Sequence, residues 1–166
     1  MSKKIIIVGG GFAGYTAALR LAKGNDVTLI EKENLGGTCL NKGCIPTKLF
    51  LHYSLKEKIL RRIQEKSEKT ISELVSGIKL LLDNKKITYI NDEAKIASKN
   101  SLLLKKAGKT LSFDTLILSL GSEPIIPEKF RGARGTLTSD DIIKLEETPK
   151  RLVIIGGGYI GVEFAH

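Results

Sequence analysis

The only two cysteines of this 166-residue chain, Cys39 and Cys44, lie close together in the run GGTCLNKGCIPTK (36–48). Such a pair serves as a structural disulfide, as part of a metal site or as a redox couple. A disulfide closing so small a loop removes little entropy from the unfolded chain. A zinc site needs further ligands, and besides carboxylates only His52 and His166 are available. The residue types therefore favour redox chemistry, with the other two uses left open.

The spacing of the cysteines also predicts their local structure. Positions five apart on an ideal helix are separated by about 7.5 Å along the axis, beyond the roughly 7 Å between Cα atoms that a disulfide tolerates. We therefore expect an irregular turn between Cys39 and Cys44, which Gly43 permits, followed by a helix that starts at Pro46. The start of that helix and the Lys48 ammonium would both favour a thiolate.

The N-terminal residues form a predicted βαβ unit that could position this chemistry. Residues 3–22 (KKIIIVGGGFAGYTAALRLA) predict a buried strand, a glycine turn and a helix, and residues 25–33 predict a second strand ending at Glu31. In a dinucleotide-binding turn, the first glycine makes the tight turn, the second admits a pyrophosphate and the third permits close helix packing, while the acid binds ribose hydroxyls. The three glycines are Gly9, Gly11 and Gly14.

The middle of the chain predicts helices and then short strands. Apolar residues recur at helical spacing from Leu51 to Ile63 and from Ile71 to Leu82, which indicates two amphipathic helices or one helix with a break near Ser67. Short strands separated by turn signals are predicted at residues 85–90, 93–98, 101–106 and 109–121.

The end of the chain repeats the opening design. Residues 151–165 (RLVIIGGGYIGVEFA) predict a buried strand at 152–155 that runs into a second GxGxxG turn. Two such turns imply two dinucleotides, but a second strand with its acid would lie beyond His166. We therefore expect an N-terminal fragment, with residues 1–149 as one domain and 150–166 as the first strand and truncated helix of the next. The glycines of the second turn are Gly156, Gly158 and Gly161.

Charge and hydropathy argue against nucleic-acid and membrane partners. The formal net charge is +9, but acids and bases alternate along stretches such as 56–73, as on a solvated helix face. Aromatic residues make up 5% of the chain and no nucleic-acid motif is present. No apolar run approaches the roughly 20 residues that cross a bilayer, and no signal peptide precedes the first strand. These features predict a cytoplasmic protein.

Four runs, in this order, carry a family resemblance: GGGFAGYTAA, GGTCLNKGCIPTK, TLILSLGSEP and LVIIGGGYIGVEFA. Together they resemble the N-terminal portion of class I pyridine nucleotide-disulfide oxidoreductases. Within that family, Leu40, Ile45 and Thr47 are most similar to the dihydrolipoamide dehydrogenase version of the motif. The resemblance implies an α/β fold, namely a Rossmann-like FAD-binding domain of the glutathione reductase type. Such a domain has a parallel sheet with helices and a small antiparallel meander.

The resemblance also implies roles for individual residues. Cys44 matches the thiol that contacts the flavin, and Cys39 matches the thiol that exchanges with the substrate. Lys48 resembles the lysine beside the reactive flavin nitrogen, and Glu163 resembles its glutamate partner. The alternative for this last pair is an ordinary surface ion pair.

The implied cofactor contacts are spread along the chain. The second glycine turn would bind NAD. Ser119 and Leu120 depart from the family, which usually shows Ala and Thr there. The residues expected at FAD are Gly9, Gly11, Gly14, Glu31, Lys32, Gly37, Thr38, Lys48, Ala94 and Gly121.

The implied activity is that of an FAD-dependent dihydrolipoamide dehydrogenase. Such an enzyme oxidises dihydrolipoyl groups on lipoamide or on a lipoyl-bearing protein, reduces NAD⁺ through the Cys39–Cys44 redox disulfide and acts as a homodimer. The family's catalytic histidine comes from a later segment, and His52 does not match it. We therefore expect this chain alone not to turn over. The alternatives are a glutathione-type or mercuric reductase, and a dinucleotide-binding module without catalysis.

Overall fold

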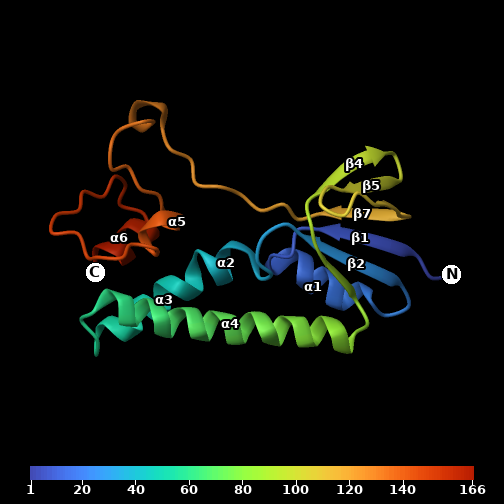
Figure 1. Cartoon of the computed structure of the whole chain (residues 1–166), viewed down its shortest axis with the longest axis horizontal. Coiled ribbons are helices and arrows are strands. Elements are labelled where there is room, and N and C mark those ends of the chain that lie inside the picture. Colours follow the sequence, from blue (N-terminus) through green and yellow to red (C-terminus); the bar gives the residue numbers. More distant parts are fainter. The chain divides into compact units, whose positions relative to one another are not determined.

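The computed structural model describes residues 1–166 without a gap, as an α/β chain with two compact units. One unit comprises residues 1–39 and 74–121, and the other comprises residues 40–73 and 122–166. Figure 1 labels the elements in chain order. No helix is both long and apolar enough to cross a membrane.

A four-stranded parallel sheet is the centre of the first unit. Its strand order is β3-β2-β1-β7. The register pairs Val8, the last residue of β1, with Ile30 on β2 and with Leu118 on β7. The segments that follow these three strands therefore start at the same edge of the sheet, where ligands bind in open α/β sheets. The strands are β1 (Lys4–Val8), β2 (Asp26–Glu31), β3 (Thr88–Asn91) and β7 (Thr115–Leu118).

Helix α1 (Phe12–Leu21) and the end of α4 (Leu60–Asn84) pack against one face of this sheet. Because both faces of a parallel sheet are covered, its strands are apolar almost throughout. Ala18 on α1 and Leu82 on α4 are fully buried. The buried residues of this cluster are Ile5, Ile7, Ala18, Val27, Leu29, Leu35, Leu82 and Ile87.

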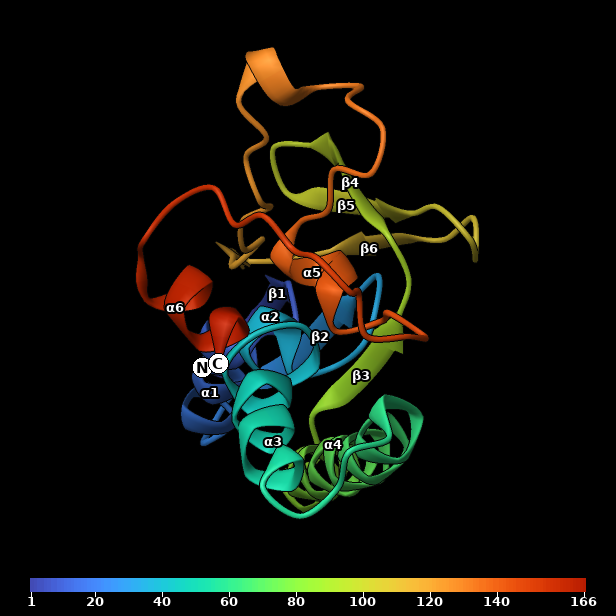
Figure 2. The same cartoon turned by 90° about the vertical axis from the view of Figure 1, so that its left-hand side faces the viewer.

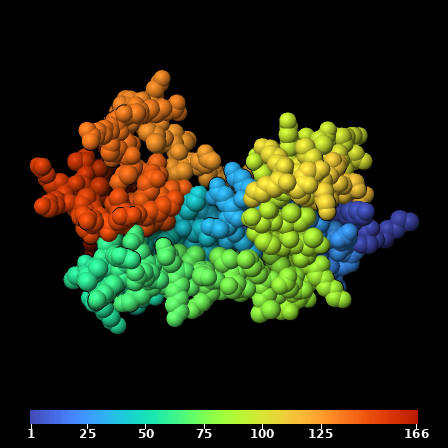
Figure 3. Space-filling view, in the orientation of Figure 1, coloured from blue at the N-terminus to red at the C-terminus, as the bar shows by residue number.

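A three-stranded antiparallel sheet covers the opposite face through Leu102 and Leu104, which pack with Ile6 and Ile30. Figure 2 shows this sheet beside the parallel one, and in Figure 3 its yellow-green and yellow residues lie next to the blue N-terminal residues. The predicted parallel sheet and meander are thus confirmed. The strands of the meander are β4 (Ala94–Ser98), β5 (Ser101–Leu104) and β6 (Thr110–Ser112).

Asp92 ties the meander to the end of β3. Its carboxylate accepts hydrogen bonds from the backbone N–H groups of Glu93 (2.6 Å), Lys106 (2.9 Å) and Ala107 (3.0 Å). Burial opposes ionisation of Asp92, but these three N–H donors and the Lys106 charge outweigh it and lower the pKa of the carboxyl group. Two of these donors, Lys106 and Ala107, lie in the turn between β5 and β6, so Asp92 holds this turn at the end of β3.

The helical region contradicts one prediction from the sequence. Helix α3 (Cys44–Ser54) ends before the expected break, and α4 runs through Ser67 without interruption. The Ser67 hydroxyl donates to the carbonyl of Ile63 (2.8 Å), and the residue is 1% exposed. A serine satisfied in this way does not end a helix. The break lies at residues 55–59 instead.

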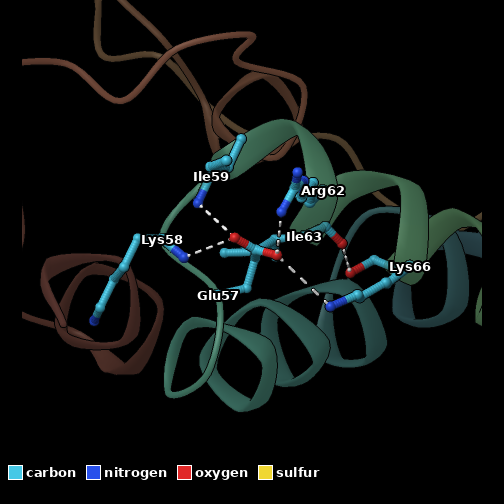
Figure 4. A network of polar contacts seen from close by, with 7 residues as sticks. Glu57, Lys58, Ile59, Arg62, Ile63 and Lys66 are labelled. Atoms are coloured by element: carbon cyan, nitrogen blue, oxygen red, sulfur yellow. Dashed lines mark hydrogen bonds and ion pairs between the residues drawn. The ribbon is translucent and has the colours of Figure 1, made fainter.

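Glu57 stabilises the start of α4 after that break (Figure 4). Its Oε1 accepts from the backbone N–H groups of Lys58 (3.0 Å) and Ile59 (3.1 Å), and its Oε2 forms ion pairs with Arg62 and Lys66. The Ile59 N–H lowers the pKa of Glu57, burial opposes this, and the Lys58 N–H and the two cations add to the lowering. The carboxylate therefore binds the two residues just before α4 and two cations in the first turns of the helix, where negative charge is favourable.

The strand expected at residues 152–155 is absent from the structure. The side chains of Val153 and Ile155 are 86% and 67% exposed. A strand needs a neighbour to pair its backbone groups, and no strand of this structure pairs with these residues. Three short helical segments complete the chain: the 3₁₀ turn η1 (Glu128–Phe130), α5 (Ser139–Ile142) and α6 (Tyr159–Ala165).

Candidate functional site

The first glycine turn follows β1, and Gly9 enters it with φ +105°, a conformation that favours glycine. The Gly9 N–H donates to the carbonyl of Ile30 (2.8 Å). A Cβ atom at Gly9 would lie 2.0 Å from the carbonyl oxygen of Ser119. The backbone following β1 is therefore in close contact with the segment following β7, and only glycine fits at this position.

The third glycine of the fingerprint packs directly on the first. A Cβ atom at Gly14 would lie 1.8 Å from the carbonyl oxygen of Gly9. Helix α1 thus approaches the turn more closely than a larger residue would permit. This is the geometry that a dinucleotide-binding turn requires of its third glycine.

The second glycine lies against the segment that leads to the cysteines. Gly11 forms an isolated parallel bridge with Gly36, and the Gly36 N–H donates to the carbonyl of Gly10 (2.8 Å). A Cβ atom at Gly37, which has φ +64°, would lie 2.6 Å from the Cα atom of Gly11. The structure therefore brings together two predicted cofactor residues, Gly11 and Gly37, that are distant in the sequence.

The start of α1 offers backbone donors without a side-chain cap. Its N-cap residue is Gly11, which has no side chain to accept a hydrogen bond from the first turn. Uncapped N–H groups and the positive end of the helix dipole suit a phosphate. The glycine cradle and the uncapped helix thus fit the pyrophosphate of a dinucleotide.

Glu31 reaches the same turn from the end of β2. Its Oε2 accepts from the Gly10 N–H (2.6 Å), and its Oε1 accepts from the Glu33 N–H (2.8 Å). Each carboxylate oxygen retains acceptor capacity for a ribose hydroxyl. Lys32, which follows Glu31, is exposed.

Sequence reasoning missed Asn91, which holds the Glu31 turn. Its amide Nδ2 donates to the carbonyls of Glu31 (3.1 Å) and Glu33 (2.8 Å). The register pairs Asn91 with Glu31 at the ends of β3 and β2. The available signal was a polar residue directly after the strand predicted at 85–90, but the neighbour of Asn91 depends on the order of strands in the sheet.

The predicted break in the helix near Gly43 is present, but it is shorter than expected. Cys39 and Cys44 are themselves helical, and the second helix starts at Cys44 instead of at Pro46. Helix α2 (Gly37–Asn41) carries Cys39, and Cys44 is the first residue of α3. Gly43 is non-helical, with φ −132° and ψ −117°. The Thr47 hydroxyl donates to the carbonyl of Gly43 (2.8 Å) and thereby anchors the start of α3. Both cysteines are exposed, as thiol exchange requires.

Lys48 on α3 forms an ion pair with Glu163 on α6. The two side chains are 59% and 27% exposed. The pairing expected from the resemblance is therefore present, and its chemical role stays a prediction.

The remaining predicted residues occupy scattered positions. Thr38 is exposed on α2, Ala94 begins β4, and Gly121 has φ +74° shortly after β7.

The second glycine turn repeats part of the geometry of the first. Gly156 has φ +111°, and a Cβ atom at Gly161 would lie 2.4 Å from the Gly156 carbonyl oxygen. Gly158 is the N-cap of α6.

Comparisons with known proteins show the family of this chain. The family model described as pyridine nucleotide-disulphide oxidoreductase matches residues 3–166. Dihydrolipoyl dehydrogenases from Staphylococcus aureus and Geobacillus stearothermophilus are 36% and 34% identical to this chain; each match covers 95% of the chain and 38% of the relative. The HOCl-induced flavoprotein disulfide reductase RclA from Escherichia coli has a TM-score of 0.88 and 33% identity, over 98% of this chain and 38% of that protein.

Proposed function

Since this chain belongs to the pyridine nucleotide-disulphide oxidoreductase family, we propose that it is the FAD-binding and thiol-bearing part of a dihydrolipoyl dehydrogenase. The chain spans 38% of the length of the Staphylococcus aureus enzyme, so activity belongs to the longer protein. The observation that carries the proposal is the contact of Gly11 with Gly37, because it joins the dinucleotide turn to the segment that bears the cysteines.

The residues around the first turn would hold FAD. Gly9, Gly11 and Gly14 present a backbone cradle, and the uncapped start of α1 supplies N–H donors for the pyrophosphate. Glu31 would accept hydrogen bonds from the adenosine ribose. The other proposed contacts are Lys32, Gly37, Thr38, Lys48, Ala94 and Gly121. When bound, FAD supplies an acceptor for two electrons.

The two cysteines would exchange with the substrate. A thiolate of a dihydrolipoyl group attacks Cys39 of the Cys39–Cys44 disulfide, and Cys44 leaves as a thiolate. The second substrate thiolate then closes the lipoyl disulfide and releases Cys39. The dithiol loses two electrons and two protons, and the cysteine pair gains the electrons. Cys44 would be the thiolate that faces the flavin, and bound FAD and then NAD⁺ would supply the acceptors for these electrons.

The Lys48–Glu163 pair would adjust the charge beside the flavin. A lysine ammonium stabilises negative charge that develops during reduction, and Glu163 opposes this effect. The pairing of the two residues supports this role. The alternative is a surface ion pair without influence on the cofactor.

The remaining parts of the proposal concern the longer protein: its NAD site, its partners and its second subunit. Gly156, Gly158 and Gly161 would bind NAD at the start of a second domain, with the division at residues 1–149 and 150–166. The partners would be lipoamide or a lipoyl-bearing protein and a second subunit of a homodimer. The cytoplasmic location stays a prediction.

A different disulfide substrate is the second candidate. The Escherichia coli flavoprotein disulfide reductase is 33% identical to this chain, close to the 36% of the Staphylococcus aureus dihydrolipoyl dehydrogenase. The family site alone therefore leaves room for glutathione-type and mercuric reductases. This chain by itself would be a binding module without turnover.

Two measurements test the proposal. The purified chain is expected to bind FAD, seen as a change in visible flavin absorbance, and Gly14→Ala should abolish binding. The longer protein is expected to reduce NAD⁺ with dihydrolipoamide and to lose this activity in Cys39→Ser. Preference for glutathione disulfide or mercuric ion would favour the second candidate, and absence of FAD binding in both proteins would overturn both.

A further inference from the structure

Ser119 follows β7 directly and contacts the first glycine turn. The parallel register pairs Leu118 with Val8, which places position 119 beside Gly9. The Ser119 N–H donates to the carbonyl of Val8 (2.8 Å). Its hydroxyl Oγ lies 2.8 Å from the carbonyl oxygen of Gly9 and 3.1 Å from that of Val8, and donates to both. One serine therefore binds two consecutive carbonyls of the turn.

The turn is consequently held from two strands. On one side the Gly9 N–H donates to Ile30 at the end of β2, and on the other the Gly9 carbonyl accepts from Ser119 after β7. A Cβ atom at Gly14 would lie 2.7 Å from Ser119 Oγ, so the hydroxyl occupies the space beside the third glycine. A glycine at φ +105° has many other accessible conformations, and each added bond reduces their population.

We propose that Ser119 is a positioning residue for the FAD site, holding the Gly9 carbonyl so that the turn is ordered before the cofactor binds. This inference rests on the proposed function. A site that already has its binding conformation loses less conformational entropy on binding, so its apparent affinity is higher. The sequence resemblance predicts alanine at this position, and alanine would lack the hydroxyl that makes these contacts.

The first test uses the chain without ligand. Amide hydrogen exchange at Gly9 is compared in wild type, Ser119→Ala and Ser119→Thr. Ser119→Ala should exchange about fivefold faster, equivalent to one hydrogen bond of about 1 kcal/mol, and Ser119→Thr should be close to wild type. Ser67→Ala is the matched control, because it removes a hydroxyl-to-carbonyl bond of 2.8 Å elsewhere in the chain. Unchanged Gly9 exchange in Ser119→Ala would overturn the inference.

The second test measures binding of FAD and of ADP, which carries the adenosine and pyrophosphate without the flavin. Ser119→Ala should weaken both by about fivefold, while Ser119→Thr and Ser67→Ala should bind as wild type does. Faster exchange with unchanged affinities would overturn the positioning role. Binding of neither ligand by the wild-type chain or by the longer protein would overturn the proposed function instead, and the exchange result would still report whether Ser119 holds the turn.

Discussion

Lys48 and Glu163, 115 positions apart in the sequence, form an ion pair between α3 and α6. The lysine side chain is 59% exposed, and pairs so open to water contribute about 1 kcal/mol or less to stability. The free energy of unfolding should therefore depend little on this pair, and the role proposed for it beside the flavin needs a separate test.

Glu163→Gln is expected to raise the reduction potential of bound FAD. The substitution leaves the Lys48 charge uncompensated, which favours the reduced flavin, by about 30 mV for the two-electron couple. The free energy of unfolding should change by less than about 1 kcal/mol. Potentials are measured by reductive titration of the FAD-loaded protein. Glu65→Gln, which breaks the exposed Arg61–Glu65 pair, is the control; equal potentials in both variants would indicate an ordinary surface pair.

Cys44→Ser and Cys39→Ser are expected to differ in the flavin spectrum. If Cys44 is the thiol beside the flavin, the partly reduced protein should show a long-wavelength charge-transfer band, and Cys44→Ser should lack it. Cys39→Ser should retain the band and lose exchange with dihydrolipoamide. The absorbance of the FAD-loaded variants after gentle reduction checks both statements. A band that survives in Cys44→Ser would reverse the assigned order of the thiols.

Gly14→Ala is expected to lower the free energy of unfolding by about 1–3 kcal/mol, because its Cβ atom would lie 1.8 Å from the Gly9 carbonyl. Gly77→Ala is the matched control. A Cβ atom at Gly77 on α4 meets no atom within 4 Å, and alanine there should stabilise the chain by about 0.5–1 kcal/mol. Urea unfolding measures both. Similar values for the two variants would contradict the close packing of α1 on the turn.

Asp92→Asn is expected to make stability less sensitive to acid. The folded pKa of Asp92 is below the ordinary aspartate value of 3.8, so the ionised group stabilises the fold above about pH 3.8. This contribution is lost as pH falls through the folded pKa. The urea midpoint should therefore fall less steeply below pH 4 in the variant than in wild type, and the variant should be less stable at neutral pH.

Asp114→Asn is the control for the Asp92 experiment. Asp114→Asn removes an exposed carboxylate that accepts one backbone N–H, from Lys4 (2.8 Å). Other carboxyl groups with lowered pKa values will keep part of the acid sensitivity in Asp92→Asn; they are Glu57, Glu93 and Asp141. Parallel pH curves for wild type and Asp92→Asn would rule out the assigned role of the Asp92 hydrogen bonds.

The helices show where periodicity is insufficient. Apolar spacing predicted helix from Leu51 to Ile63 and a break near Ser67, but residues 55–59 are not helical and α4 continues through Ser67. A polar serine between two apolar runs suggested the end of a helix. Only the structure shows that the Ser67 hydroxyl donates to the carbonyl of Ile63 inside α4. The true break is at residues 55–59. Inside it, Glu57 accepts from the N–H groups of Lys58 and Ile59, and periodicity does not report such contacts.

The sequence alone determined the local features of this protein: the βαβ unit, both glycine turns, short strands between residues 85 and 121 and a helix break at Gly43; the meander was implied by the family resemblance. The features read from the residues depend only on residues that are close in the sequence: on the period of the apolar residues, on the conformations that glycine permits and on the geometry of a helix. The tertiary structure alone decided that Gly11 meets Gly37, that Asn91 holds the Glu31 turn and that Ser119 binds the Gly9 carbonyl. These contacts depend on which strands are neighbours and in what register, and that arrangement results from burying the apolar faces of the whole sheet together.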